Sequence, residues 1–192
     1  MADPLRTERV VLRDGRAVII RPATLEDAAG LIENINTVVA EDVYILIDSV
    51  PMDLNAERRW LASFDGKRSA LLVGCDGPRI VGQVDCHGGR FTKNRHVGTV
   101  GIAIRDGWRE IGLGRILMGR ILEWMRARGF LKAQLCVFAT NVRATRLYES
   151  LGFQIEGARR QAIRIRGEFI DEIMMGLWLG ERTPPRRDEG AS

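Results

Sequence analysis

The amino-acid sequence predicts a single α/β domain in which helices flank a mixed, mostly antiparallel sheet. Short apolar segments rich in valine and isoleucine recur between turn signals such as Asp14-Gly15 and Asp76-Gly77, which is typical of strands. Longer segments, above all residues 112–128, repeat their apolar residues with the 3.6-residue period of a helix. A length of 192 residues corresponds to about one domain.

In residues 1–64 these signals predict two strands and two helices. The first helix begins at Thr24 and Asp27, which resemble a capping box, and the second is capped by Asp53 or Asn55. The expected ranges are 10–12, 17–21, 24–35 and 53–64. Segment 37–53 is predicted to be a loop or a short helix.

From residue 69 onward, glycines and polar residues separate the predicted strands and helices. We expect strands at 69–75, 80–86, 97–104 and 133–138, helices at 112–128 and 141–151, and two final strands at 153–165 and 169–179. The order ββααβββαβαββ combines antiparallel neighbours with one strand–helix–strand crossover. The domain is expected to cover residues 1–180, and the tail 181–192 is expected to be disordered.

Composition excludes several classes of protein. A hydrophobic fraction of 45% and a charged fraction of 28% are typical of globular chains. No apolar run could span a membrane and the N-terminus lacks a signal-peptide pattern, so we expect a cytoplasmic protein without membrane contact. Three cysteines without C-x-x-C spacing predict no disulfide framework, with Cys136 as a buried small hydrophobe. Two histidines are too few for an expected metal site.

The basic residues are unevenly distributed and almost all are arginines. Lysines account for only three of the 29 basic residues, and residues 97–192 carry a net charge of +5 against −1 for residues 1–96. Codon bias explains the arginines as well as an anion-binding role does, and both interpretations stay open. Nucleic-acid binding is not expected, because no basic stripe with interleaved aromatics accompanies the pI of about 9.3.

The segment Arg109-Glu110-Ile111-Gly112-Leu113-Gly114 carries the first chemical signal. It lies between a strand and the start of the longest predicted helix, where small residues let an anion approach exposed backbone amides. The helix dipole attracts that anion, and Arg109 and Arg115 add full charges. The sequence therefore predicts a phosphate site here. A dinucleotide fingerprint is disfavoured because Leu117 replaces its third glycine.

A second segment strengthens this signal. Asn141, Ala144, Tyr148 and Gly152-Phe153 form the pattern N-x-x-A-x-x-x-Y-x-x-x-G-F, about 27 residues after Gly114. Together the two motifs resemble those of the GCN5-related N-acetyltransferase (GNAT) family over about residues 17–180. The resemblance implies the acyl-CoA N-acyltransferase fold, acetyl-CoA as acetyl donor, and an amine as acceptor.

The resemblance also implies roles for individual residues. The backbone of the strand before the phosphate loop would pair with the pantetheine arm and the acetyl carbonyl, and the loop amides would hold the pyrophosphate. Tyr148 would be the general acid that protonates the leaving thiolate, and Asn141 would bond the pantetheine region or a water. The implied cofactor-binding residues are Ile102, Ala103, Ile104, Arg109, Glu110, Ile111, Gly112, Leu113, Gly114, Arg115, Asn141 and Tyr148.

Simpler structural roles compete with two of these assignments. Asn141 has the residue type and position of a helix N-cap. Tyr148 occupies an apolar position of the predicted helix and could be an ordinary core residue.

The general base is open. Many members of the family carry a glutamate on the strand before the phosphate loop, where this chain has Thr99. Glu41, Asp42 and Asp85 are the remaining carboxylates considered, with His96 a weaker candidate. Glu41 is assigned as base or acceptor-binding residue, against a solvated loop charge as the alternative, and Asp85 could instead be paired with an arginine.

The family resemblance predicts direct acetyl transfer to a small-molecule or protein amine in a ternary complex. The competing hypothesis is a non-catalytic acyl-CoA-binding or regulatory domain of the same fold. The missing strand glutamate keeps this alternative open, whereas the presence of Tyr148 and Asn141 favours the enzyme. A homodimer is common in the family, although no pattern specifies an interface.

Overall fold

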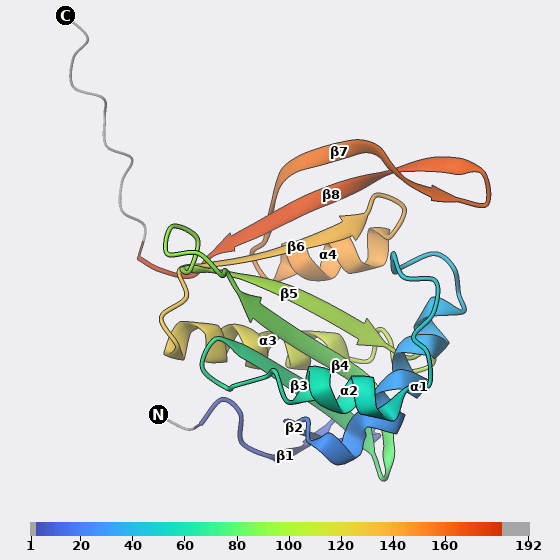
Figure 1. Cartoon of the computed structure of the whole chain (residues 1–192), viewed down its shortest axis with the longest axis vertical. Helices are drawn as coiled ribbons and strands as arrows, with labels where there is room; N and C mark the ends of the chain where they lie inside the picture. Colours follow the sequence, from blue (N-terminus) through green and yellow to red (C-terminus); the bar gives the residue numbers. More distant parts are fainter. Residues whose placement is uncertain (1–2, 182–192) are drawn as a thin grey trace, which may run out of the picture.

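A computed structural model describes residues 3–181 and contains one eight-stranded sheet in the order β1-β2-β3-β4-β5-β6-β8-β7 (Figure 1). The strands are β1 (Glu8–Val11), β2 (Ala17–Pro22), β3 (Ser69–Asp76), β4 (Arg79–Gly88), β5 (Val97–Ile104), β6 (Lys132–Phe138), β7 (Gln154–Ile165) and β8 (Glu168–Trp178). The helices are the 3₁₀ turn η1 (Leu25–Asp27), α1 (Ala28–Val39), α2 (Leu54–Leu61), α3 (Leu113–Ala127) and α4 (Val142–Ser150). The predicted fold class and element order are confirmed.

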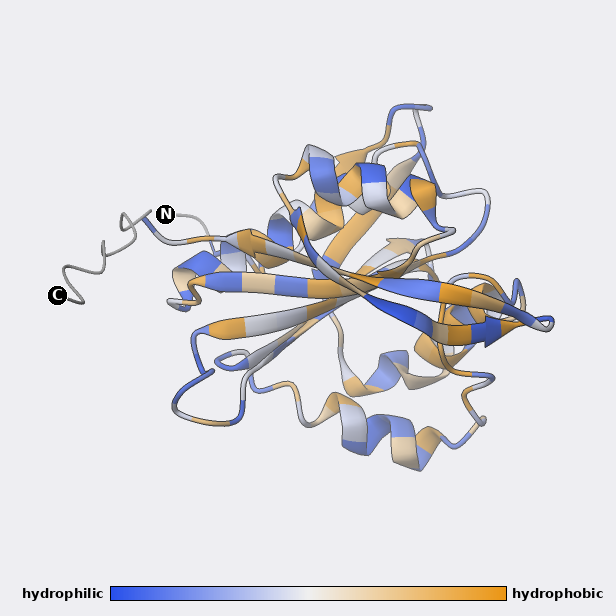
Figure 2. Cartoon of the chain, turned by 90° about the horizontal axis from the view of Figure 1, so that it is seen from above, coloured by the Kyte–Doolittle hydropathy of each residue, from blue (hydrophilic) through white to orange (hydrophobic). Residues whose placement is uncertain are grey.

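Helices cover both faces of the sheet. Helix α3 packs on β3, β4 and β5 from one side, whereas α1 lies on β4 and β5 from the other and contacts α2. Figure 2 shows the strands between these helical layers. The larger core cluster lies on the α3 side, where Leu117, Met118 and Trp124 are fully buried. This packing fixes the start of α3 relative to β5.

Helix α1 is longer than the sequence indicated. It runs to Val39 instead of ending near residue 35, because polar residues in its last turn find local partners. The Thr37 hydroxyl donates to the Asn34 carbonyl, and the Asn36 amide exchanges two 2.8 Å hydrogen bonds with the backbone of Val50. Asn36 therefore holds the far end of segment 40–53 against the helix.

Capping explains the start of the neighbouring helix and of η1. Of the two expected caps for α2, the structure selects Asp53, whose Oδ1 accepts from the amides of Asn55 and Ala56. Asp27 accepts from the Thr24 amide at 2.7 Å, as the capping pattern predicted. Helix α2 ends at Leu61, and residues 62–64 form a turn instead of its last residues.

Strands β5 and β6 form a parallel pair that parts after three residues. Val97–Thr99 pairs with Lys132–Gln134, and the two strands then diverge (Figure 1). Each keeps its other neighbour, since β5 pairs with β4 up to Ile104 and β6 pairs with β8 up to Phe138. The sheet therefore opens in its middle and leaves residues 100–104 with one unpaired edge.

The divergence also corrects the prediction for Cys136. Burial alternates along β6, which places Cys136 with Gln134 on the open face, so this thiol is exposed. Cys75 and Cys86 are buried as expected, and the cysteines of the described residues are free. Apart from Glu181, the tail predicted to be disordered lies outside the described residues. Among residues 3–181, no helix combines the length and apolarity needed to cross a membrane.

Replacing Leu117 by alanine tests how strongly α3 depends on its apolar face. Leu117 is fully buried against Gly82 of β4. We expect Leu117→Ala to lower the free energy of unfolding by about 2–5 kcal/mol through lost burial and a residual cavity. Urea denaturation followed by circular dichroism measures the loss. Leu131→Ala, at a leucine that is 40% exposed, is the control and should cost less than about 1 kcal/mol. Equal losses would show that α3 is not anchored in this way.

Candidate active site

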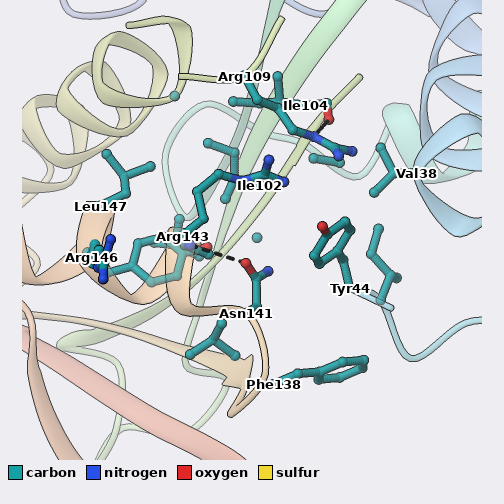
Figure 3. Close-up of a pocket in the computed structure, with 18 of the residues that line it drawn as sticks. Val38, Tyr44, Ile102, Ile104, Arg109, Phe138, Asn141, Arg143, Arg146 and Leu147 are labelled. Carbon is teal, nitrogen blue, oxygen red and sulfur yellow. Dashed lines mark hydrogen bonds between the residues drawn. The ribbon is translucent and has the colours of Figure 1, made fainter. Parts of the chain in front are cut away.

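The opening between β5 and β6 is part of a cavity of about 820 Å³. Figure 3 shows its lining from β5, β6, α3, α4, the end of α1 and segment 40–53. Most of the residues assigned from the sequence meet here, although they come from two separate segments of the chain, residues 102–115 and 141–148. The lining includes Ile102, Ala103, Ile104, Arg109, Glu110, Gly112, Gly114, Arg115, Asn141 and Tyr148.

The unpaired edge of β5 offers backbone groups to this cavity. The Arg105 amide donates to the Val81 carbonyl, and hydrogen-bonding direction alternates along an antiparallel strand. The amides and carbonyls of Ile104 and Ile102 therefore face the opening, whereas those of Ala103 face Gln83 in β4. This corrects the expectation that all three backbones are available. Ala103 contributes a small side chain instead.

The N-terminus of α3 has no side-chain cap. Gly112, at the N-cap position, has φ +102°, a left-handed conformation that favours glycine. Helices α2 and α4 are capped by Asp53 and Asn141, whereas the first amides of α3, those of residues 113–115, have no partner within the described residues. A Cβ at Gly114 would lie 3.0 Å from the Ile104 side chain, so the helix start is packed closely against β5.

Arginines surround this end of the cavity. Arg13, Arg115, Arg143 and Arg146 line it, and Arg115 donates to the Ser150 hydroxyl at 2.7 Å. Their charges add to the partial positive charge of an uncapped helix N-terminus. The arrangement is suited to a polyanion.

Arg109 does not contribute its charge in the way the sequence suggested. Its guanidinium forms a two-armed ion pair with Glu41 and donates to the Ile104 carbonyl at 2.7 Å. The Tyr44 ring lies beneath it, 5.1 Å away, and faces Arg143 at 5.4 Å (Figure 3). Arg109 therefore joins segment 40–53 to the end of β5.

The same contacts correct the assignment of Glu41. Both of its carboxylate oxygens are taken by Arg109, and it does not line the cavity. Asp42 pairs with Arg166 at 3.2 Å and is exposed. Sequence reasoning missed Tyr44, whose only signal was its place in the unassigned segment.

Asn141 and Tyr148 both lie at the cavity, on α4. The Asn141 Oδ1 accepts from the Ala144 amide at 3.1 Å, which is the N-cap role (Figure 3), and its Nδ2 group has no partner among the described residues. Tyr148 is 7% exposed and packs on Phe153. Burial raises the pKa of its hydroxyl to about 12, so the phenol is protonated at physiological pH. Both residues therefore combine a structural contact with access to the cavity.

Three carboxylates line the cavity, and their surroundings differ. Glu172 of β8 is buried and pairs with Arg159, and Glu110 is exposed in the loop before α3. Asp85 of β4 is 22% exposed and lies over Gly101 of β5. Burial raises the pKa of Asp85 to about 7. The arginine partner considered for Asp85 is not found among residues 3–181. Nor do those residues contain a group of three or more potential metal ligands.

Comparisons with known proteins agree on one family. The model of the acetyltransferase (GNAT) family matches residues 40–153, more than half of the chain. An L-amino acid N-acetyltransferase of Escherichia coli is 29% identical over 108 residues, which span 54% of this chain and 65% of that relative, slightly under two thirds. The L-methionine sulfoximine/L-methionine sulfone acetyltransferase of Pseudomonas aeruginosa is 27% identical over 83% of this chain and 94% of its own length.

A solved structure shows the same fold. The putative acetyltransferase from Salmonella typhimurium, determined with its cofactor acetyl-CoA, has a TM-score of 0.78 and 24% sequence identity. The match covers 88% of this chain and 97% of that one.

Replacing Asp85 by asparagine should make stability less sensitive to pH. Because folding raises the Asp85 pKa from 3.8 to about 7, its burial is tolerated below pH 4 and destabilises the fold as pH rises through 7. A shift of about 3 pKa units corresponds to at most about 4 kcal/mol. We expect Asp85→Asn to gain about 2–4 kcal/mol over the wild type between pH 4.5 and pH 8. Urea titrations at both pH values measure this.

Asp65→Asn is the control of opposite sign. Burial raises the Asp65 pKa, but backbone amides of Arg68, Lys67 and Ser69 outweigh it and lower the pKa to about 2. Its stabilising contribution is present above pH 4 and is lost as pH falls through 2. Asp65→Asn should therefore lose stability relative to the wild type at pH 8. An Asp85→Asn difference that does not change with pH would contradict a buried, cation-free carboxyl.

Proposed function

The chain belongs to the acetyltransferase (GNAT) family, and we propose that it transfers the acetyl group of acetyl-CoA directly to a primary amine in a ternary complex. One observation carries the proposal. A single cavity unites the open backbone edge of β5, the uncapped N-terminus of α3 and the Tyr148 side chain. These are the groups needed to hold a thioester by its polyanionic end and to act on its sulfur.

Acetyl-CoA binds this cavity through two kinds of contact in our proposal. The pyrophosphate accepts hydrogen bonds from the amides of residues 113–115 at the α3 N-terminus, with Arg115 nearby. The pantetheine arm lies in the opening between β5 and β6, where it pairs with the backbone of Ile102 and Ile104 like an added strand. Arg13 and Arg146 supply positive charge for the nucleotide end. The Asn141 Nδ2 group is free to donate to the arm.

The chemistry requires a tetrahedral intermediate and a departing thiolate. The neutral amine attacks the thioester carbonyl, a C–N bond forms, and the C–S bond breaks with its electron pair on sulfur. An outward-facing amide of β5 stabilises the oxyanion. The amine nitrogen loses a proton as the sulfur gains one, so the products are an amide and a free thiol.

Tyr148 is the general acid in this scheme. Its pKa of about 12 keeps the proton in place. A free thiol has a pKa of about 8.5, so full proton transfer from Tyr148 to the thiolate is uphill by about 5 kcal/mol in the empty site. The hydroxyl therefore acts chiefly through a hydrogen bond that strengthens as the C–S bond breaks.

We propose that the acceptor amine is the α-amine of an amino acid or of a related small molecule. The named activities of the E. coli and P. aeruginosa relatives, on L-amino acids and on methionine derivatives, support this class. Asp85 gives the cavity a carboxyl that suits an amine, whereas the charge of Glu172 is offset by Arg159. We place the enzyme in the cytoplasm, which agrees with its free cysteines. The homodimer and the domain limit at residue 180 remain predictions.

An acceptor screen tests the proposed function. Purified protein with acetyl-CoA should release free thiol when L-amino acids or methionine sulfone are added, and mass spectrometry should find the acetylated amine. Polyamines, aminoglycosides and peptides with free N-termini complete the panel. A non-catalytic acyl-CoA-binding domain would bind acetyl-CoA in calorimetry without turnover for any amine, and that outcome would reject the proposal.

The variant Tyr148→Phe tests the general acid. We expect kcat to fall about 10²-fold, because the departing sulfur loses its hydrogen-bond donor, while the Kd for acetyl-CoA stays within about twofold. Steady-state kinetics and calorimetry give the two values. Phe153→Leu is a packing control at the Tyr148 ring and should leave kcat within a few-fold. An unchanged kcat in Tyr148→Phe contradicts the assignment.

A further inference from the structure

The side chain of Asp85 has room only because the residue opposite it on β5 is a glycine. It lies directly opposite Gly101 in the antiparallel pair, and a Cβ at Gly101 would come within 2.8 Å of Asp85 Oδ1. The absence of a side chain at Gly101 therefore gives the carboxyl its place over β5. The next residue, Ile102, presents its backbone to the gap in which the thioester is proposed to lie. The Asp85 carboxyl thus lies over the β5 residue next to Ile102, whose backbone is proposed to contact the thioester.

Of the three carboxylates of the cavity, Asp85 is the one that is largely shielded from solvent and yet has no arginine or lysine bound to it within residues 3–181. Glu172 is bonded to Arg159, and Glu110 is exposed in the phosphate loop. Among residues 3–181, the basic side chain nearest to Asp85 is the His87 ring, with Nε2 at 3.6 Å from Oδ2. A carboxylate bonded to an arginine is a poor base, because proton uptake breaks the pair. Asp85 has no such pair to break.

His87 connects Asp85 to the surface. It lies two residues further along β4, so its side chain is on the same face of the sheet. The ring packs on Phe64 at 4.8 Å, does not line the cavity, and is 46% exposed. Burial and the nearby charge of Arg90 lower its pKa, so the ring is neutral at pH 7 and can accept a proton.

We propose that Asp85 is the general base of the acetyl transfer and that His87 passes the proton from Asp85 to solvent. This inference rests on the proposed function and assigns the base that Thr99 cannot provide. The acceptor enters as an ammonium group, Asp85 takes one proton from its nitrogen, and the freed electron pair attacks the thioester carbonyl. The proton then moves from the Asp85 carboxyl to His87 Nε2, and the imidazolium releases it to water.

The energetics favour a base at this point. An ammonium group of pKa about 8 is about a tenth deprotonated at pH 7, and a lysine-like amine of pKa about 10.4 far less. Burial brings the Asp85 pKa to about 7, close to the working pH and to that of an α-amine, where a general base is most effective. The place of the Asp85 carboxyl over Gly101 and its pKa both favour Asp85 as the base.

Other titratable groups face the same region and must be distinguished in any pH profile. Opposite Asp85, β5 carries no titratable side chain, and on α1 Glu33 is bonded to Arg105. The titratable cavity groups from the remaining elements are Arg13, Tyr44, Arg109, Glu110, Arg115, Cys136, Arg143, Arg146, Tyr148 and Glu172, the last bonded to Arg159. Burial raises the pKa values of Tyr148 and Cys136 above their ordinary values of 10 and 9. His87 and the acceptor amine also titrate in this range, so the assignment of an inflection near pH 7 to Asp85 rests on its loss in Asp85→Asn.

The test compares Asp85→Asn, Asp85→Glu and Asp42→Asn with the wild type. With the best L-amino acid of the screen, the wild-type kcat/KM should rise with pH through an inflection near 7. Asp85→Asn should lose about 10²–10⁴-fold at pH 7 and should lack the inflection, and Asp85→Glu should recover part of the rate. Replacing the acceptor by its amide, which has a less basic amine, should shrink the loss. Asp42→Asn, at an exposed carboxyl, should match the wild type.

His87→Gln tests the second half of the proposal. In dilute buffer its kcat should fall several-fold and should be restored by added imidazole, whereas imidazole should not restore Asp85→Asn. A kcat that is independent of buffer in His87→Gln would overturn the relay. Carboxyl NMR of the protein with ¹³C-labelled aspartate should show one carboxyl titrating near pH 7 that disappears in Asp85→Asn, without any acceptor.

The possible failures are distinguishable. If the wild type acetylates an amine and Asp85→Asn keeps both its rate and its inflection, the base assignment is wrong and the proposed function stands. If the wild type binds acetyl-CoA and acetylates no amine of the panel, both are wrong. A melting temperature of Asp85→Asn at or above that of the wild type, and an acetyl-CoA Kd within about twofold of it, exclude misfolding as the cause.

Discussion

The site depends on the early parting of β5 and β6. Parallel strands satisfy each other's backbone groups only while they run together, and here the pairing stops after Thr99 and Gln134. Because β4 and β8 hold the outer edges of the two strands, the opening does not unravel the sheet. The unsatisfied inner edge of β5 is thus a stable feature, and a ligand with amide groups can supply the missing partners. In the proposed complex, the pantetheine arm of acetyl-CoA supplies these partners.

Two further contacts hold the opening in shape. The Gln134 side chain donates to the Thr99 hydroxyl at 3.0 Å and closes the pair at its last residues. At the other end, Arg109 binds the Ile104 carbonyl and Glu41 together, so segment 40–53 is joined to the tip of β5. Tyr44 lies between Arg109 and Arg143 and extends that connection to α4. The arginine expected to hold phosphate instead builds one wall of the cavity.

The element order and the residues that line the α3 and α4 end of the cavity could be predicted because their signals are local. Gly112, Gly114, Asn141 and Tyr148 lie in short motifs whose spacing sets their positions on α3 and α4. The partners of Glu41 and Arg109 could not be predicted, since 68 residues separate them and only the packing of α1 against β5 brings them together. The expectation that Cys136 is buried is wrong for the same reason. An apolar strand looks buried on both faces until the direction of its neighbour is known.

The same limit explains why the base could not be identified from the sequence alone. A carboxylate at position 99 would lie where Thr99 now binds Gln134, so this chain uses the position to close the strand pair. In the antiparallel register of β4 and β5, Thr99 faces His87 and Gly101 faces Asp85, which makes Asp85 and Thr99 diagonal neighbours on one face. A carboxyl at position 85 of β4 can lie over β5 beside Thr99 only if the residue directly opposite it on β5 has no side chain. Gly101 meets this condition, and the pairing of Asp85 with a glycine is therefore as much a part of the site as the carboxyl itself.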